Sequence, residues 1–142
     1  MAEGIFNKLM ESCKYTAFSR GLQAFGSHAS ENAIICADKL YGVNLKKHIS
    51  KNITEDDIKE AILILTMTEQ HKNILQNLFK EHTEKIFTLK EYCGKDNDHI
   101  DIDDDTDIQD PYGSDIDTYM DCAKEIGNCV EILIRCIISQ QK

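Results

Sequence analysis

One uninterrupted apolar run, from Ala61 to Leu65, constrains the fold of this chain more than any other segment. It is too apolar and too short for a helix at the protein surface, and such runs are typical of a parallel strand buried on both faces. Thr68 can cap a following helix, and another short apolar segment, from Ile86 to Leu89, comes after it. A further strand is expected from Thr16 to Leu22. Strands that alternate with helices predict an α/β domain with a parallel sheet.

Apolar residues at spacings of three and four predict the helices that accompany this sheet. We expect an N-terminal helix over residues 3–15, a second one between the N-cap Ser30 and the stop signal Gly42, and a short one after Thr54. The longest should begin near Ser114. Its predicted inward face consists of Ile116, Tyr119, Met120, Ala123, Ile126, Val130, Leu133 and Ile137.

Composition limits the classes of function. The net charge of −9 argues against nucleic-acid binding, which needs a basic footprint, although eight of the acidic residues are aspartates between Asp96 and Asp110. No apolar run is long enough to span a membrane, so no membrane association is expected. Six cysteines without a recognisable secretion signal favour thiols in a reducing cytoplasm.

Two cysteine–arginine pairs invite comparison with the C-x5-R loop of cysteine-dependent phosphatases, and we reject both. Cys129 and Arg135 have the right spacing, but the five residues between them include no Gly, Ser or Thr and lie within the predicted C-terminal helix. A phosphate loop needs several backbone N–H groups turned inward, and those of a helix interior are already hydrogen-bonded. Cys13 and Arg20 are separated by six residues, one too many.

No metal or cofactor is expected. The aspartate-rich segment begins like a calcium loop, but Thr106 stands where such a loop needs glycine and Tyr112 where it needs glutamate. A solvated acidic loop is the preferred interpretation, with weak cation binding as the alternative. Cys122, Cys129 and Cys136 recur every seven residues, share one stripe of the helix and are expected to fill space near the core.

The segment from Asp110 to Gly113, Asp-Pro-Tyr-Gly, would be an ordinary β-turn if it stood alone. Other segments, in order along the chain, give it a context. They are Met1-Ala2-Glu3 with Phe6, Ser19-Arg20-Gly21, Gly42 to Leu45 with His48, Leu63 to Thr68 with His71 and Lys72, Lys85 to Tyr92, and Asp115 to Tyr119. Together they resemble the low-molecular-weight protein tyrosine phosphatase family, and within it the bacterial protein arginine phosphatases most closely.

The resemblance implies a three-layer α/β/α fold with a small parallel sheet in the order 2-1-3-4. It also implies a two-step hydrolysis of a phosphorylated protein, in which a cysteine thiolate attacks phosphorus and an aspartic acid protonates the leaving group. Asp110 matches that aspartate, Pro111 would fix its loop, and Tyr112 would line the pocket wall. Ser19 and His48 match polar residues that support the nucleophile loop.

The family's first strand and its C-x5-R-S-P loop have no counterpart in this sequence. We therefore expect a single phosphatase-like domain over residues 1–142 that is N-terminally incomplete and inactive in this form. An absent central strand would leave the edge of residues 61–65 open to self-association. Two functions stay open, namely a phosphotyrosine or phosphoarginine phosphatase domain and a non-catalytic relative that acts as a binding or regulatory module.

Overall fold

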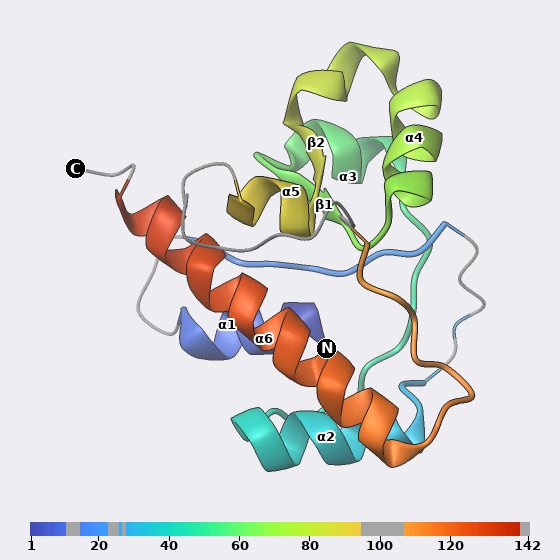
Figure 1. Cartoon of the computed structure of the whole chain (residues 1–142). Helices are drawn as coiled ribbons and strands as arrows, with labels where there is room; N and C mark the ends of the chain where they lie inside the picture. Colours follow the sequence, from blue (N-terminus) through green and yellow to red (C-terminus); the bar gives the residue numbers. More distant parts are fainter. Residues whose placement is uncertain (11–14, 23–25, 27, 95–106, 140–142) are drawn as a thin grey trace. The chain divides into compact units, whose positions relative to one another are not determined.

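The computed structural model describes residues 1–10, 15–22, 26, 28–94 and 107–139 (Figure 1). The chain divides into two compact units. The first unit consists of Met1–Asn52 with Asp110–Lys142, and the second consists of Ile53–Gln109.

Three helices make up the core of the first unit: α1 (Ala2–Leu9), α2 (Glu31–Tyr41) and α6 (Ile116–Ser139). The long helix α6 contacts both α1 and α2 (Figure 1). Its buried residues are Tyr119, Cys122, Ala123, Ile126, Gly127, Val130, Leu133 and Cys136. Most of the predicted inward face is therefore confirmed, but Ile116 is 38% exposed because it lies at the first position of the helix.

Local signals fixed the ends of α2 as expected. The side chain of Ser30 accepts a hydrogen bond from the N–H of Ala33, which satisfies one of the unpaired donors at the start of the helix. Gly42 ends the helix with a φ of 64°, a left-handed conformation that glycine adopts without a steric penalty. Ile5 and Phe6 of α1 are buried. The helix predicted over residues 3–15 ends at Leu9, with Met10 as its C-cap and Tyr15 outside any helix, and residues 11–14 lie outside the described residues.

The second unit holds a small parallel sheet and its helices: α3 (Glu55–Glu60), β1 (Ile64–Thr66), α4 (Glu69–Leu78), η1 (Lys80–Lys85), β2 (Ile86–Thr88) and α5 (Leu89–Gly94). Strands β1 and β2 pair in parallel, with Ile64 opposite Ile86 and Thr66 opposite Thr88. The α/β class with a small parallel sheet is confirmed. The full order 2-1-3-4 stays a prediction.

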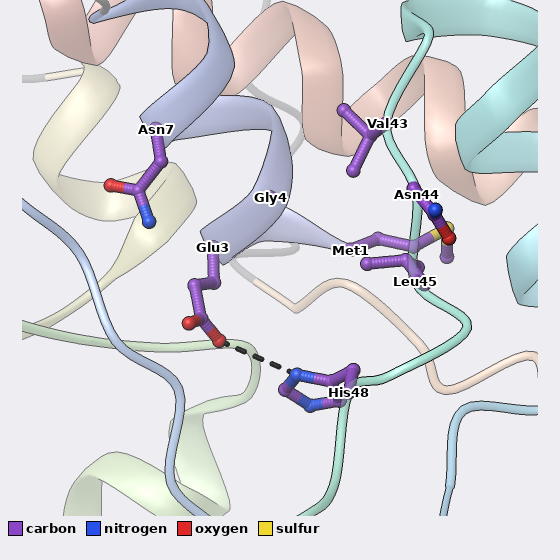
Figure 2. Close-up of a pocket in the computed structure, with 8 residues that line it drawn as sticks. All are labelled: Met1, Glu3, Gly4, Asn7, Val43, Asn44, Leu45 and His48. Atoms are coloured by element: carbon purple, nitrogen blue, oxygen red, sulfur yellow. Dashed lines mark ion pairs between the residues drawn. The ribbon is translucent and has the colours of Figure 1, made fainter.

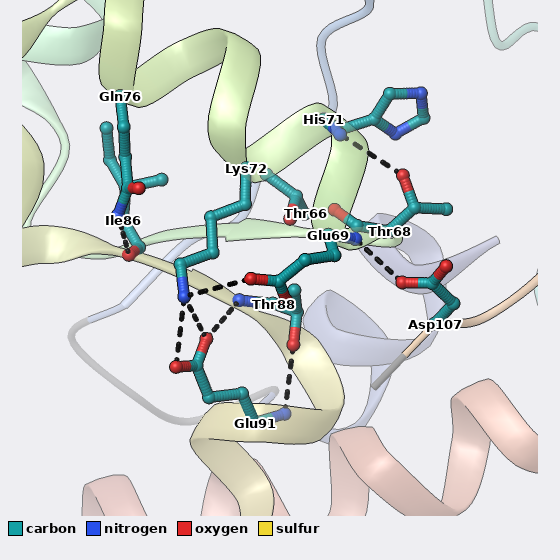
Figure 3. A network of polar contacts seen from close by, with 10 residues as sticks. All are labelled: Thr66, Thr68, Glu69, His71, Lys72, Gln76, Ile86, Thr88, Glu91 and Asp107. Carbon is teal, nitrogen blue, oxygen red and sulfur yellow. Dashed lines mark hydrogen bonds and ion pairs between the residues drawn. The ribbon is translucent and has the colours of Figure 1, made fainter. Parts of the chain in front are cut away.

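A polar network ties α4 to β2 and α5 within this unit (Figure 3). The ammonium group of Lys72 donates to the carboxylate of Glu91 at 2.8 and 3.0 Å and lies 3.6 Å from Glu69. Thr88 and Glu91 exchange two hydrogen bonds, each between a side chain and the other residue's N–H, at the start of α5. The carboxylate of Asp107 accepts from the N–H of Glu69 at the start of α4.

The strands expected over residues 16–22 and 61–65 both differ from the structure. Residues 16–20 form no strand, and Gly21 makes only an isolated parallel bridge with Asn52. A strand depends on a partner's ladder, and its composition alone does not create one. The run from Ala61 to Leu65 contributes only its last two residues to β1, because Ala61 caps α3.

The run is also not buried on both faces: Ile62 is 77% exposed, and Ile64 and Leu65 are half-buried. Of the large apolar residues on α4, Leu75 is buried, whereas Ile74 and Leu78 are 38% and 64% exposed. None of the helices in the described ranges combines the length and the apolar character that crossing a membrane requires.

Candidate functional site

The carboxylate of Glu3, in the first turn of α1, brings together two of the predicted site residues. Its Oε2 atom accepts hydrogen bonds from the N–H of Ser19 at 3.1 Å and from the hydroxyl of Ser19 at 2.5 Å. The same atom lies 3.7 Å from Nδ1 of His48. Ser19 and His48 therefore meet at one carboxylate, although 29 positions of sequence separate them.

Each segment of this Glu3–Ser19–His48 cluster is held by contacts of its own. The side chain of Asn7 exchanges two hydrogen bonds with the backbone of Ala17, at 2.9 and 2.8 Å, and so keeps the extended residues 15–20 beside α1. The segment that leads to His48 approaches α1 at Gly4, where a Cβ atom would lie 2.5 Å from Val43. Glycine is needed at position 4 for this close approach.

A small cavity of about 230 Å³ opens beside the cluster. It is lined by Met1, Glu3, Gly4, Asn7, Val43, Asn44, Leu45 and His48 (Figure 2). Val43 and Leu45 form an apolar part of its wall. The polar part consists of the carboxylate of Glu3, the carboxamides of Asn7 and Asn44 and the imidazole of His48. This combination is typical of pockets that orient a polar group against an apolar wall.

The predicted acid, Asp110, is exposed at the start of a closed turn in the same unit. Its carboxylate accepts from the N–H of Tyr112 at 3.0 Å, and the N–H of Ser114 donates to the carbonyl of Pro111 at 2.8 Å. Pro111 is buried, whereas Tyr112 is 79% exposed. Gly113 completes the turn with a φ of 83°, which favours glycine.

The first turns of α6 relate Asp110 to the beginning of α1. Met1 packs against a buried cluster that includes Tyr119 and Ala123. Burial raises the pKa of the neighbouring Cys122 thiol, and the charges of Glu125 and Asp110 act in the same direction. The charges of Asp110 and of the Met1 amino group therefore both act on the pKa of the same thiol on α6.

The described cysteines occupy helices, and none of them lies in a phosphate-binding loop. Cys36, Cys93, Cys122 and Cys136 are buried, and Cys129 lies in the middle of α6. Burial raises the pKa of the Cys36 thiol, as it does for Cys122, which opposes formation of a thiolate.

Cys13 and the aspartate-rich residues 95–106 lie outside the described residues. Within the described part of the chain, no three His, Cys, Asp or Glu side chains converge as metal ligands would.

Sequence reasoning missed Glu3 and Asn7 as members of the site. Both lie on α1, four positions apart, so they share one face of the helix. That face is polar beside the buried pair Ile5 and Phe6. A polar stripe next to an apolar one is also what any surface helix shows, so the sequence alone gave no reason to single these residues out.

The chain matches a known protein family over its whole length. The family model for low molecular weight phosphotyrosine protein phosphatase matches residues 1–142. The chain belongs to this family. The protein-arginine-phosphatase of Bacillus subtilis (strain 168) is 30% identical over 143 residues, which cover 100% of this chain and 87% of the relative.

Solved structures of this phosphatase family agree with the fold. The YwlE arginine phosphatase from Geobacillus stearothermophilus superposes with a TM-score of 0.87 at 26% identity, covering 99% of this chain and 84% of the other. The low molecular weight protein tyrosine phosphatase from T. tengcongensis gives a TM-score of 0.83 at 34% identity, covering 94% of this chain and 87% of the other. Both tyrosine and arginine phosphatases thus occur among the relatives.

Proposed function

We propose that this chain carries the general acid and the supporting residues of a phosphatase that hydrolyses phosphotyrosine or phosphoarginine in proteins. We further propose that the 142-residue chain by itself does not complete this reaction. The observation that carries the proposal is the placement of Asp110. Its carboxylate is exposed at the start of a hydrogen-bonded turn, in the same compact unit as the Glu3–Ser19–His48 cluster.

The chemistry assigns two proton transfers to Asp110. In the first step, a thiolate forms a sulfur–phosphorus bond while the bond from phosphorus to the tyrosine oxygen or the arginine nitrogen breaks, and the carboxylic acid protonates that leaving group. In the second step, the Asp110 carboxylate takes a proton from water as the water attacks phosphorus and the thiolate departs. An exposed carboxyl at a fixed turn can serve both steps, because solvent and substrate both reach it.

None of the described cysteines provides the thiolate. The one pair with C-x5-R spacing, Cys129 and Arg135, lies inside α6, where the backbone N–H groups are committed to the helix. A phosphate group there would find no inward-facing amides. The buried thiols of Cys36 and Cys122 have raised pKa values and are poor nucleophiles near neutral pH.

An assay with p-nitrophenyl phosphate tests the second half of the proposal. The 142-residue chain should show no turnover above background. Turnover that disappears in Cys129→Ser would show that the helix does supply a nucleophile, and the proposal would then be wrong. Cys136→Ser is a matched control on the same stripe of α6, and its effect on any turnover should be nil.

Extending the chain before Met1 with a family-type strand and C-x5-R-S-P loop tests the first half. The extended protein should hydrolyse aryl phosphates, and Asp110→Asn should lower its rate by about 10²–10⁴-fold, the usual range for loss of a general acid. An unchanged rate in Asp110→Asn would mean that Asp110 is only a turn residue. An extended protein that folds but has no activity would favour a non-catalytic role.

A further inference from the structure

The segment after the acid turn is attached to α2 by side chains from two elements. The carboxamide of Asn32 donates to the carbonyl of Ser114 at 3.3 Å. The hydroxyl of Ser30 donates to the hydroxyl of Tyr119 at 3.0 Å. Both contacts join the first residues of α2 to residues 4 and 9 positions after Asp110, and all of these residues belong to the first unit.

The hydrogen bond between Ser30 and Tyr119 lies in a partly buried environment. Tyr119 is 4% exposed and packs with Cys36 and Ala123, so its hydroxyl needs a partner within the protein. The same Ser30 oxygen accepts from the N–H of Ala33 as the cap of α2. The start of α2 and the first turn of α6 are therefore fixed to each other through one hydroxyl group.

The chain between Asp110 and Tyr119 leaves little freedom between these attachment points. The turn at Pro111 is closed by the N–H of Ser114, and the carboxylate of Asp115 accepts from the N–H of Thr118 at 2.9 Å as the cap of α6. Ser114, whose N–H closes the turn, is also the residue whose carbonyl Asn32 binds. A displacement of Ser114 would therefore be transmitted to the turn that carries Asp110.

We propose that Tyr119 and Asn32 are positioning residues for Asp110, because together they hold the acid turn against the N-terminal end of α2. This inference rests on the proposed function of Asp110 as the general acid. Positioning matters for this role because proton transfer to a leaving group requires a fixed donor–acceptor geometry. Neither residue needs to touch the substrate.

The consequence is a specific kinetic signature. For a phosphatase that works through a phosphocysteine, kcat/KM reports the steps up to departure of the leaving group. A basic leaving group such as phenolate needs the acid more than p-nitrophenolate does. A misplaced Asp110 therefore raises the ratio of kcat/KM for p-nitrophenyl phosphate to kcat/KM for phenyl phosphate, whereas a general loss of stability lowers both values together.

The test uses four variants of the extended protein. They are Tyr119→Phe, Asn32→Ala, the double variant that combines these two changes, and Asp110→Asn as the reference for loss of the acid. We expect each single variant to raise the ratio by roughly 3- to 10-fold, the factor that one hydrogen bond typically contributes, and the double variant, which removes two, to raise it further. Thr54→Ala is the control, because it removes the cap of α3 in the other unit and should change the melting temperature without changing the ratio.

The outcomes separate the two proposals. If Asp110→Asn leaves the ratio unchanged, the acid role is refuted and the positioning role with it. If Asp110→Asn raises the ratio and the double variant does not, only the positioning role is refuted.

Should the double variant fold poorly, Asn32→Ala alone carries the test, because Asn32 is half-buried and does not belong to the buried core. In the 142-residue chain itself, Asn32→Ala should also speed hydrogen exchange of the Ser114 and Tyr112 amides. Unchanged exchange would contradict the inference.

Discussion

Replacing Gly127 with alanine tests how tightly α2 and α6 are packed. Gly127 is buried in the middle of α6, and a Cβ atom at this position would lie 1.6 Å from the hydroxyl oxygen and 2.3 Å from Cζ of Tyr41, the last residue of α2. Because a third ring atom, Cε2, would be at 2.9 Å, turning the hydroxyl alone relieves nothing. The whole ring has to withdraw by roughly 2 Å to reach ordinary van der Waals contact.

Two free-energy terms oppose each other in Gly127→Ala. Alanine favours the helix over glycine by about 1 kcal/mol. Forcing an extra carbon into a packed site typically costs about 1–3 kcal/mol. We therefore expect a net loss of about 1 kcal/mol in the free energy of unfolding, which corresponds to a fall of roughly 3 °C in Tm for a chain of this length.

A double-mutant cycle with Tyr41→Ala isolates the clash. Once the ring is gone, Gly127→Ala should stabilise the chain by up to about 1 kcal/mol, because only the helix preference remains. Urea unfolding of the four proteins measures the coupling. Burial, followed by the charge of Glu131, raises the pKa of Tyr41, so a displaced ring should also show a lower pKa in an absorbance titration. Equal stabilisation by Gly127→Ala in both backgrounds would refute the reasoning.

Two further predictions concern the second unit. Lys72→Met should destabilise the chain by about 1.5–3 kcal/mol in urea unfolding, because it removes hydrogen bonds to the charged Glu91. Glu69→Gln, which weakens the 3.6 Å contact to Lys72 and keeps the bonds to Glu91, should cost far less. The hydrogen bond to Glu91 raises the pKa of Lys72. The stabilisation by Lys72 is therefore complete below the unfolded pKa of about 10.4 and is lost as the pH rises through the folded pKa. The difference in stability between the unaltered chain and Lys72→Met should vanish in strong alkali. Among the described residues β1 pairs only with β2. Self-association through the other edge of β1 should appear in size-exclusion chromatography as a concentration-dependent shift that Ile62→Lys reverses; a monomer at all concentrations with a melt above about 60 °C would contradict it.

Features determined by neighbouring residues were predictable from the sequence. The cap at Ser30, the stop at Gly42 and the short helix after Thr54 all form as expected, because each depends on residues only a few positions apart. Thr54 forms its capping box with Asp57, three residues further on. The turn at Asp110 belongs to the same category. Its proposed chemical role came from the resemblance to a family, since the turn residues alone indicate only a turn.

Features that depend on distant partners were predicted less well. The segment of residues 16–22 has a composition that favours a strand, yet it forms only one bridge, because a ladder needs a neighbour along its whole length. The apolar run before β1 is half-exposed for the same reason. Leu78 has the correct helical phase to face inward, but at the end of α4 it has little to pack against and is 64% exposed.

The role of Glu3 shows why a site can be harder to predict than the helix that carries it. An acidic residue in the first turn is favoured by the partial positive charge at a helix N-terminus, so its occurrence there needs no function. What distinguishes Glu3 is that a single oxygen contacts Ser19 and His48, which are 16 and 45 positions away. These contacts exist only once Asn7 holds residues 15–20 beside α1 and Gly4 admits Val43. The five residues from Glu3 to Asn7 thus fold as an ordinary helical turn and also determine where the supporting residues of the proposed site meet.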